Sequence, residues 1–374
     1  GDVLIDGGNA HYKATERRGK MLATKGMHYI GTGVSGGEEG ALKGPSIMPG
    51  GSVAAYELVR PFLESIAARD VLKTACCVRV GEGGAGHFVK MVHNGIEYAE
   101  MQLIAECYGL LRWGMQWSPE QIADCFAQWE TTSLSSYLLQ ISIDILRKKE
   151  GENYLLDLVL DQAGNKGTGS WTTIAACELG VPIPTISTAL FARYLSAFKT
   201  QRVQAAALYQ NAYSTIDFDP DALAQAYDLA RIVNHHQGFH LIAAASQAHD
   251  WNIDLSGLAR IWTNGCIIRS DQMQALIEVL KTHPYILQHP QIQATAQKQQ
   301  EALAKLVALG AQAQIAIPCL SASAQYYHAY VQAQSSANMI QAQRDYFGAH
   351  TYRRIDDSSG KRYHSNWQSE SAST

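Results

Sequence analysis

Long hydrophobic runs are missing from the sequence. No window approaches the roughly 18 consecutive apolar residues that a membrane-spanning helix needs, which excludes such a helix. An excess of basic residues is missing as well, because 30 Lys and Arg stand against 34 Asp and Glu, for a formal net charge of -4. This balance provides no electrostatic footprint for nucleic acid or for an anionic membrane surface. Residues 1–30 also lack a signal-peptide pattern.

Paired cysteine spacings are absent too. The 7 cysteines are odd in number and loosely spaced, with no C-x-x-C. This pattern indicates reduced structural thiols and a cytoplasmic protein. The one adjacent histidine pair, His235 and His236, would point to different faces of a helix. We therefore expect no metal site.

The sequence does contain enough apolar material for a sizeable core, since 47% of its 374 residues are hydrophobic and 17% are charged. Residues 3–8 predict a buried strand that ends in a glycine turn, residues 11–25 a polar helix, and residues 28–31 a second strand. This β-α-β order predicts a parallel sheet in an α/β region. No G-x-G-x-x-G fingerprint of a dinucleotide site opens the chain.

The composition changes near residue 84. Glycine and proline become rarer beyond it, while alanine, glutamine and leucine become commoner in long helical patterns. We therefore predict an α/β region over residues 1–83, a large all-α domain over residues 84–341 and a polar tail over residues 342–374. The tail is too short to fold alone and needs another surface to dock on.

The most informative segment is a predicted helix from about Gly86 to Trp113. Apolar residues recur along it at steps of three and four, which predicts one buried stripe. At about 100° per residue, four polar residues share one face over two turns: Lys90, His93, Asn94 and Glu97. A solvated row of hydrogen-bonding side chains is one interpretation. A reactive site is the other, because the cluster directly follows the glycine-rich run at residues 81–86, where two domains would meet.

Five long motifs, in this order along the chain, resemble those of decarboxylating 6-phosphogluconate dehydrogenases of the pentose phosphate pathway. They are Ile5–Asn9, Gly33–Ala41 together with Gly44–Gly51, His87–Tyr98, Asp161–Gly169 and Gln343–Thr351. The resemblance covers essentially the whole chain. It implies an α/β remnant of a Rossmann-type coenzyme domain, lacking the N-terminal part that holds the dinucleotide fingerprint. An all-α substrate and dimerisation domain and a C-terminal tail follow it.

The resemblance also implies a reaction and its participants. 6-Phosphogluconate and NADP would give ribulose 5-phosphate, carbon dioxide and NADPH without a metal, in a homodimer whose tails enter the partner subunit. A desolvated lysine can serve as the base and an acid of raised pKa as the proton donor. The implied catalytic residues are Lys90 and Glu97.

The remaining implied site residues bind substrate or coenzyme. The substrate-binding set is Ser35, Gly36, Gly37, His93, Asn94, Tyr98, Lys166, Arg193, Arg344 and His350, and Asn9 lies near the nicotinamide ribose. Among these, Tyr98, Lys166, Arg193 and Arg344 would bind the phosphate, and His350 would reach in from the tail of the other subunit.

Two other interpretations stay open. A related β-hydroxyacid dehydrogenase would act on a non-phosphorylated acid, although the cations Lys166, Arg193 and Arg344 argue against it. The chain could instead be a non-catalytic, truncated helical body that dimerises without binding coenzyme. Coenzyme titration distinguishes the second alternative, and a comparison of phosphorylated with unphosphorylated acids distinguishes the first.

Overall fold

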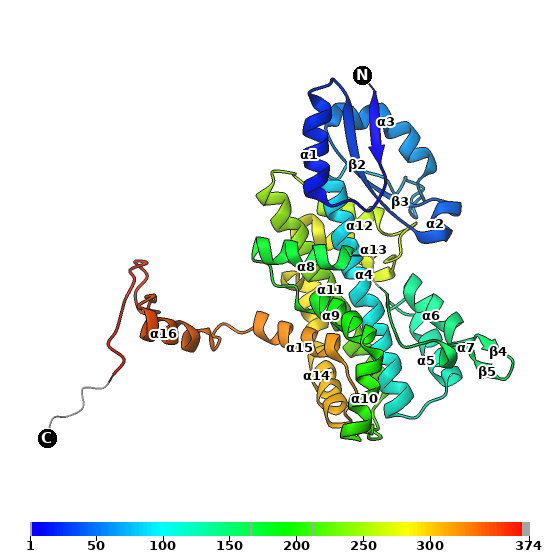
Figure 1. Cartoon of the computed structure of the whole chain (residues 1–374), viewed down its shortest axis with the longest axis vertical. Coiled ribbons are helices and arrows are strands. Elements are labelled where there is room, and N and C mark those ends of the chain that lie inside the picture. The colour runs from blue at the N-terminus through cyan, green and yellow to red at the C-terminus, as the bar shows by residue number, and fades with distance from the viewer. Residues whose placement is uncertain (1, 165–166, 211, 369–374) are drawn as a thin grey trace. The chain divides into compact units, whose positions relative to one another are not determined.

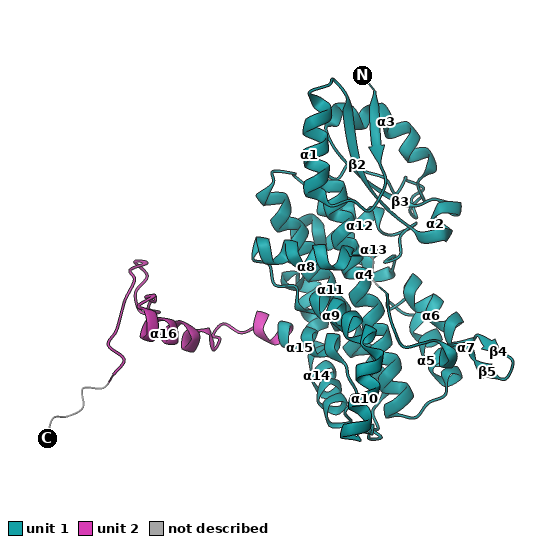
Figure 2. Cartoon of the chain, viewed as in Figure 1, with its two compact units in different colours: residues 1–326 teal, residues 327–374 magenta. Residues whose placement is uncertain are grey.

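A computed structural model of the chain describes residues 2–164, 167–210 and 212–368. The chain divides into two compact units, residues 1–326 and residues 327–374 (Figure 1, Figure 2). The first unit contains a small sheet and a long helical region, and the second contains the end of the chain. The predicted boundaries after residues 83 and 341 stay predictions; residue 341 lies inside a helix of the second unit.

The larger sheet of the first unit has three strands in the order β1-β2-β3. Strand β1 (Val3–Asp6) pairs in parallel with β2 (His28–Ser35), and helix α1 (Tyr12–Ala23) connects them. This confirms the predicted β-α-β unit. Strand β3 (Ser46–Gly50) follows the short helix α2 (Gly37–Lys43) and pairs with β2 in the antiparallel direction. Since β1 and β2 are parallel, their carboxyl ends lie at one edge of the sheet, where ligands bind in such folds.

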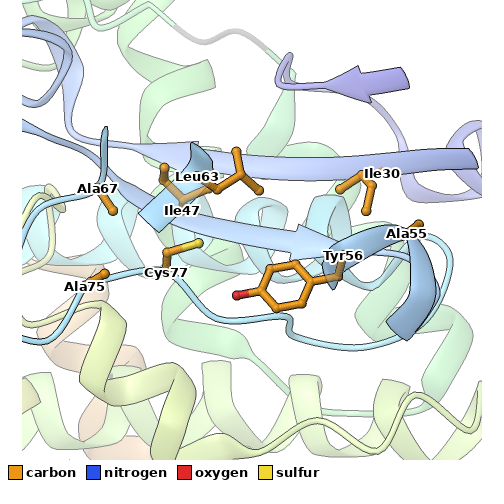
Figure 3. Close-up of a cluster of buried hydrophobic side chains, with 8 residues drawn as sticks. All are labelled: Ile30, Ile47, Ala55, Tyr56, Leu63, Ala67, Ala75 and Cys77. Carbon is orange, nitrogen blue, oxygen red and sulfur yellow. The ribbon is translucent and has the colours of Figure 1, made fainter. Parts of the chain in front are cut away.

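The two faces of the sheet are covered by different helices. Helix α3 (Val53–Ile66) covers one face, and its side chains join a buried apolar cluster with the strands (Figure 3). The labelled members are Ile30, Ile47, Ala55, Tyr56, Leu63, Ala67, Ala75 and Cys77. Because neighbouring residues of a strand face opposite sides, Gly31 and Gly33 point away from this cluster. Their face packs against helix α4 (Ala85–Gly109).

Helix α4 (Ala85–Gly109) is the central element of the first unit, and a one-turn π-helix, η1 (Leu110–Gly114), extends it. The predicted helix from Gly86 to Trp113 is therefore confirmed. Its start lies against backbone: a Cβ at Gly86 would fall 2.2 Å from the Gly31 carbonyl oxygen and 2.7 Å from the Gly50 nitrogen. Only glycine allows the helix to approach the strands this closely.

The helical region wraps α4 with further helices, as predicted. The long helix α11 (Pro220–Ala248) packs along both α4 and α14 (Pro290–Gln312). A buried ion pair joins the two central helices, because the Arg231 Nε donates to the Glu100 carboxylate at 2.9 Å. The other helices are α5 (Pro119–Glu130), α6 (Tyr137–Arg147), α7 (Leu155–Leu158), α8 (Thr168–Leu179), α9 (Pro184–Ala197), α10 (Lys199–Tyr209), α12 (Leu255–Ile261), α13 (Asp271–Thr282) and α15 (Pro318–Tyr330), with a 3-10 turn η2 (Ile286–Gln288) and the short strands β4 (Lys149–Glu150) and β5 (Asn153–Tyr154).

The second unit is organised around one carboxylate. It contains helix α16 (Ala337–Gly348), and the buried Asp345 side chain of that helix accepts four hydrogen bonds from the segment that follows. The donors are the backbone nitrogens of Thr351 and Ser365, the Trp367 indole and the His364 ring, at 2.8 to 3.1 Å. The polar tail is thus folded back onto its own helix.

The described residues lack two kinds of feature. Among them, no helix combines the length and the apolar character that crossing a bilayer requires. The same residues contain no group of three or more His, Cys, Asp and Glu side chains arranged to hold a metal ion. All seven cysteines are free thiols.

Candidate active site

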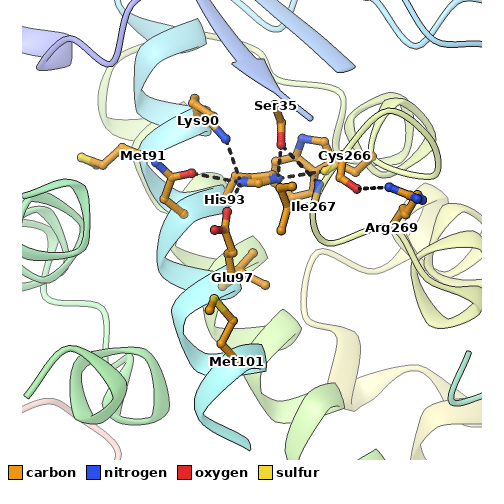
Figure 4. Close-up of polar contacts among 12 residues, drawn as sticks. Ser35, Lys90, Met91, His93, Glu97, Met101, Cys266, Ile267 and Arg269 are labelled. Carbon is orange, nitrogen blue, oxygen red and sulfur yellow. Dashed lines mark hydrogen bonds and ion pairs between the residues drawn. The ribbon is translucent and has the colours of Figure 1, made fainter. Parts of the chain in front are cut away.

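The predicted polar face of α4 forms a connected and buried cluster. Lys90, His93 and Asn94 are 7%, 0% and 8% exposed. The Lys90 Nζ lies 3.2 Å from the His93 Nδ1 (Figure 4). The Asn94 Oδ1 lies 3.2 Å from the same nitrogen. One Glu97 oxygen lies 3.7 Å from the same nitrogen. The structure therefore excludes the alternative of a solvated helix face.

The other nitrogen of His93 faces groups from distant parts of the chain. The Ser35 Oγ at the end of β2 lies 3.0 Å from the His93 Nε2, and the Cys266 Sγ lies 2.8 Å from it (Figure 4). Burial raises the pKa of the Cys266 thiol to about 12, so the thiol keeps its proton. The Nε2 therefore accepts a hydrogen bond from this thiol, and in a neutral imidazole the Nδ1 then carries the proton.

This tautomer fits a neutral Lys90. The His93 Nδ1–H points at the Asn94 oxygen and at the Lys90 nitrogen, and an uncharged amine has a lone pair to accept it. Burial lowers the pKa of the Lys90 ammonium, with partial compensation by the Glu97 charge. Burial and then the Lys90 charge lower the pKa of His93 well below its ordinary value. Both effects favour an uncharged pair at the start of the cluster.

Glu97 ends the cluster as a candidate acid. Burial raises the pKa of its carboxyl group, while Lys90 and then Arg193 act in the opposite direction. Its side chain is 22% exposed, so this end of the face opens to solvent. A base with a lowered pKa and an acid with a raised pKa on one helix face is the arrangement that two-step proton transfer requires.

A cation is fixed beside the acid. The Arg193 guanidinium lies over the Tyr98 ring, with 3.4 Å between its Cζ and the ring centroid. One guanidinium nitrogen also donates to the Gly164 carbonyl at 3.3 Å. Helix α9 thus places a planar cation next to the α4 cluster. Lys166 itself lies outside the described residues.

The glycines of the predicted Ser35–Gly36–Gly37 loop are needed for its geometry. Gly36 has a φ of 144°, and a Cβ there would meet the Gly265 carbonyl oxygen at 2.9 Å. The loop therefore sits tightly against the segment that carries Cys266. Because Ser35 ends β2, the carboxyl edge of the sheet and the α4 cluster form one site.

Three further predicted residues belong to other parts of the described chain. Asn9 is exposed in the β1–α1 loop and lines a shallow concavity of about 630 Å³. Arg344 and His350 belong to the second unit and are exposed. The Arg344 guanidinium donates to the Gln341 side chain at 3.1 Å, and the His350 ring contacts the Phe347 ring at 5.8 Å between centroids.

Two residues of the site were not predicted. Cys266 contacts His93 from a loop 173 positions further along the chain. His87 connects the start of α4 with the end of β1. The sequence contains no periodic signal for either contact, because both join elements that are separated in the chain.

A parallel strand pair whose carboxyl edge meets a functional cluster is typical of proteins that bind a dinucleotide coenzyme. Comparison with known proteins gives the family. The family model described as the NAD binding domain of 6-phosphogluconate dehydrogenase matches residues 1–81, and that described as 6-phosphogluconate dehydrogenase, C-terminal domain, matches residues 86–367. The chain belongs to the 6-phosphogluconate dehydrogenase family.

Individual relatives agree with this assignment. The chain is 46% identical to "6-phosphogluconate dehydrogenase, decarboxylating" from Shigella flexneri over 98% of its length and 80% of that protein. It is also 46% identical to the protein of the same name from Escherichia coli K12, with the same coverage. A solved structure of the Plasmodium falciparum enzyme, described in its apo form and in complexes with NADP+ and with its substrate 6-phosphogluconate, superposes with a TM-score of 0.94 at 38% identity, over 98% of this chain and 80% of that one.

One expectation from the sequence is not supported. The match to the NAD-binding family model over residues 1–81 gives no support for a mere remnant of a coenzyme domain, and it does not confirm an absent fingerprint. The G-x-G-x-x-G spacing in fact occurs at Gly31–Gly36 and at Gly81–Gly86. The first two glycines of the earlier match lie inside β2. In the later match, Gly84 directly precedes α4, and its nitrogen donates a hydrogen bond to the Glu16 carboxylate at 2.7 Å.

Proposed function

We propose that the chain catalyses the oxidative decarboxylation of 6-phosphogluconate to ribulose 5-phosphate and carbon dioxide with NADP+ as the oxidant. The observation that carries the proposal is the buried α4 face, where Lys90 and Glu97 flank His93. Burial lowers the pKa of the first group and raises the pKa of the last. A neutral base and a protonated acid are what the two proton transfers of this reaction need.

The carboxyl edge of β1 and β2 fits a dinucleotide coenzyme. Gly8 and Asn9 in the β1–α1 loop line an open concavity at this edge. Ser35 at the end of β2 joins the edge to the α4 cluster through its contact with His93. The relative from Plasmodium falciparum is described in complex with NADP+, which supports this coenzyme. When bound, the oxidised nicotinamide accepts the hydride from the substrate. Asn9 would lie near its ribose.

Lys90 would take the first proton. As hydride leaves carbon 3, the hydroxyl on that carbon loses its proton to the Lys90 amine, which gives the β-keto acid. The ammonium so formed donates a hydrogen bond to the new carbonyl oxygen. As the electrons of the bond to the carboxylate move toward that oxygen, carbon dioxide leaves. The oxygen takes the proton of the Lys90 ammonium, and an enediol and a neutral amine remain. His93 and Asn94 would orient Lys90 and hold substrate hydroxyls.

Glu97 would give the second proton. Its protonated carboxyl group donates to carbon 1 of the enediol, while the Lys90 amine takes the proton of the hydroxyl on carbon 2, and ribulose 5-phosphate results. Lys90 then loses this proton to solvent. Glu97 then regains a proton from solvent, to which its side chain is partly exposed. The loop of Ser35, Gly36 and Gly37 would bind the carboxylate of the substrate before decarboxylation, because small residues allow backbone N–H groups to approach an anion.

Cations would bind the phosphate of the substrate. Tyr98 and Arg193 are already paired beside Glu97, at the end of the cluster opposite Lys90 along α4. Arginine offers two parallel donors to a phosphate and lysine offers a compact charge. We assign this role to Tyr98, Lys166, Arg193 and Arg344 together. Non-phosphorylated acids would leave these cations without a partner.

We also propose that the protein is a homodimer in which the tail of one subunit completes the site of the other. The second unit presents Arg344, His350 and exposed apolar side chains such as Phe347, which is 72% exposed. This surface needs a partner, and the tail would supply its two polar residues to the substrate. Residues 1–83 would then serve as the coenzyme domain, 84–341 as the substrate and dimerisation domain, and 342–374 as the exchanged tail.

Subunit mixing tests the exchanged tail. An Arg344→Ala variant and a Lys90→Ala variant, each inactive alone, would be combined and allowed to exchange. A composite site predicts partial recovery, because one site of each mixed dimer holds both native residues. If exchange is demonstrated by mass spectrometry and activity stays absent, the tail serves its own chain.

Substrate comparison tests the function itself. The protein should reduce NADP+ with 6-phosphogluconate and show little turnover with gluconate at the same concentration. Equal turnover of both acids would favour a related β-hydroxyacid dehydrogenase. No binding of NADP+ in a calorimetric titration would favour the interpretation of the chain as a truncated, non-catalytic protein that dimerises without binding coenzyme. The free thiols at all seven cysteine positions are compatible with a cytoplasmic location, which is part of the same proposal.

A further inference from the structure

Helices α1 and α4 meet along a seam of matched residues. Tyr12, Thr15 and Glu16 lie on one face of α1, at the spacing that brings side chains to the same side of a helix. They face three residues of the same spacing at the start of α4, namely Gly84, His87 and Phe88. The Glu16 carboxylate accepts from the Gly84 nitrogen at 2.7 Å, and the rings of Tyr12 and Phe88 meet edge to face at 5.0 Å.

His87 is the centre of this seam and uses both ring nitrogens. Its Nε2 lies 3.1 Å from the Asp6 carbonyl oxygen, which can only accept a hydrogen bond. The Nε2 therefore carries the proton, and the Nδ1 accepts from the Thr15 hydroxyl at 2.6 Å. The ring is 2% exposed, and burial lowers the pKa of His87 despite the opposing effect of the Asp6 charge. A neutral imidazole with a fixed tautomer results.

The position of His87 connects two functional parts of the molecule. Asp6 is the last residue of β1, and the loop of residues 7–10 leaves the sheet from it at the carboxyl edge. The Asp6 side chain braces this loop by accepting from the Gly8 nitrogen at 3.2 Å. On α4, His87 precedes Lys90 by three residues, which is about one helical turn. One side chain thus ties the base of the loop to the helix that carries the candidate base.

Close packing keeps the ring in this position. Gly31 of β2 pairs with Asp6, and a Cβ at Gly31 would fall 2.4 Å from a Thr15 methyl carbon and 3.0 Å from the His87 Nδ1. The sheet therefore closes over the pair without room for another side chain. His87 has no free space for an alternative rotamer that would keep both hydrogen bonds.

We propose that His87 is a positioning residue that holds the loop of residues 7–10 in register with Lys90, so that coenzyme bound at this edge meets the substrate. The inference rests on the proposed function. The Nε2 contact with Asp6 transmits the position of the loop, while the Nδ1 contact with Thr15 only holds the ring. The two nitrogens therefore have separable roles, which a merely structural histidine would not have.

Two substitutions separate these roles. The amide of His87→Gln reaches about as far as the Nε2 and can still donate to the Asp6 carbonyl. The amide of His87→Asn reaches only about as far as the Nδ1 and leaves that carbonyl without its donor. Coenzyme affinity would be measured by isothermal titration with NADP+, and substrate affinity by titration with 6-phosphogluconate. We expect His87→Asn to weaken NADP+ binding by about fivefold to tenfold, as the loss of one buried hydrogen bond implies.

The other measurements should change little. His87→Gln should bind NADP+ within about twofold of the unsubstituted protein, and both variants should bind 6-phosphogluconate within about twofold, since a factor of two is well below the effect of one hydrogen bond. Thr15→Val is the matched control, because it removes the hydroxyl at the Nδ1 and leaves the Asp6 contact in place. It should leave NADP+ affinity unchanged.

Several outcomes would overturn the inference. Equal NADP+ affinity of the Asn and Gln variants, or an equal loss for NADP+ and 6-phosphogluconate, would show that His87 only supports the fold. A loss in Thr15→Val as large as in His87→Asn would show the same. If His87→Asn does not fold, a loss of NADP+ affinity in folded His87→Gln would contradict the assignment. If the unsubstituted protein binds 6-phosphogluconate but not NADP+, the proposed function fails first and the inference falls with it.

Discussion

Replacing Lys90 with methionine should separate catalysis from stability. The Lys90 stem packs on the sheet, since a Cβ at Gly33 would lie 2.5 Å from the Lys90 Cβ, and methionine keeps most of this apolar volume. Removing the amine leaves the His93 Nδ1 with the Asn94 oxygen as a partner at 3.2 Å. The local structure should therefore survive. Turnover should fall by about 10²–10⁴-fold, the range for loss of a general acid–base group.

The stability of this variant follows from the direction of the pKa shift. Burial lowers the pKa of Lys90 from its ordinary value near 10.5, so the unfolded chain holds this proton more tightly than the folded protein does. Burial of the charged Lys90 lowers the free energy of unfolding by its full amount at pH values below the pKa of Lys90 in the folded protein. This loss disappears as the pH rises to the pKa of Lys90 in the unfolded chain. At neutral pH, Lys90→Met should therefore be at least as stable as the unsubstituted protein.

Steady-state kinetics and thermal unfolding at neutral pH check both statements. The matched control is Lys305→Met, which removes an exposed lysine whose ion pair with Glu301 lies at the surface. It should change neither turnover nor stability appreciably. Near-normal turnover of Lys90→Met would refute the assignment of the base. A large loss of stability in Lys90→Met would refute the argument that the buried amine is held at a cost.

Three further predictions concern the site and the tail. The kcat/KM should fall at acid pH as Lys90 gains a proton and at alkaline pH as Glu97 loses one, because burial lowers the pKa of Lys90 and raises that of Glu97. The alkaline decline should vanish in Glu97→Gln. Its persistence in that variant would exclude Glu97 as the acid. Cys266→Ser should retain most activity because a hydroxyl can still donate to the His93 Nε2. Cys266→Val should lower kcat by about tenfold, the effect of one lost hydrogen bond. Equal kinetics of the Ser and Val variants would show that the thiol has no role. Burial would raise the pKa of Asp345, but hydrogen bonds from His364, Trp367 and the backbone lower it to about 2. The ionised carboxylate therefore stabilises the fold at pH values above its unfolded pKa, and this stabilisation is lost as the pH falls toward 2. Asp345→Asn should make the tail more sensitive to limited trypsin digestion at neutral pH, and an unchanged cleavage rate would contradict this.

The polar face of α4 could be predicted because it depends only on helical geometry. Once the helix from residue 86 is accepted, Lys90, His93, Asn94 and Glu97 must share a side, and the structure confirms this. The parallel pair β1 and β2 was equally accessible, because a helix of suitable length separates two apolar runs. Local spacing therefore gave both halves of the site.

Contacts between distant segments could not be predicted in the same way. The partnership of Cys266 with His93 depends on how the α12–α13 loop meets the end of β2, and a buried cysteine has no distinguishing sequence signal. The antiparallel direction of β3 follows from the short helix α2, which returns the chain to the sheet without a crossover. The folding of the tail around Asp345 depends on four donors spread over the following 22 residues.

We infer that this chain couples oxidation to decarboxylation at the α4 cluster. The most direct measurement uses 6-phosphogluconate labelled in its carboxyl carbon and follows labelled carbon dioxide and reduced coenzyme together. We expect one carbon dioxide for each coenzyme reduced, and loss of both signals in Lys90→Met. Reduction of NADP+ without release of labelled carbon dioxide, or release of both at a normal rate in Lys90→Met, would contradict it.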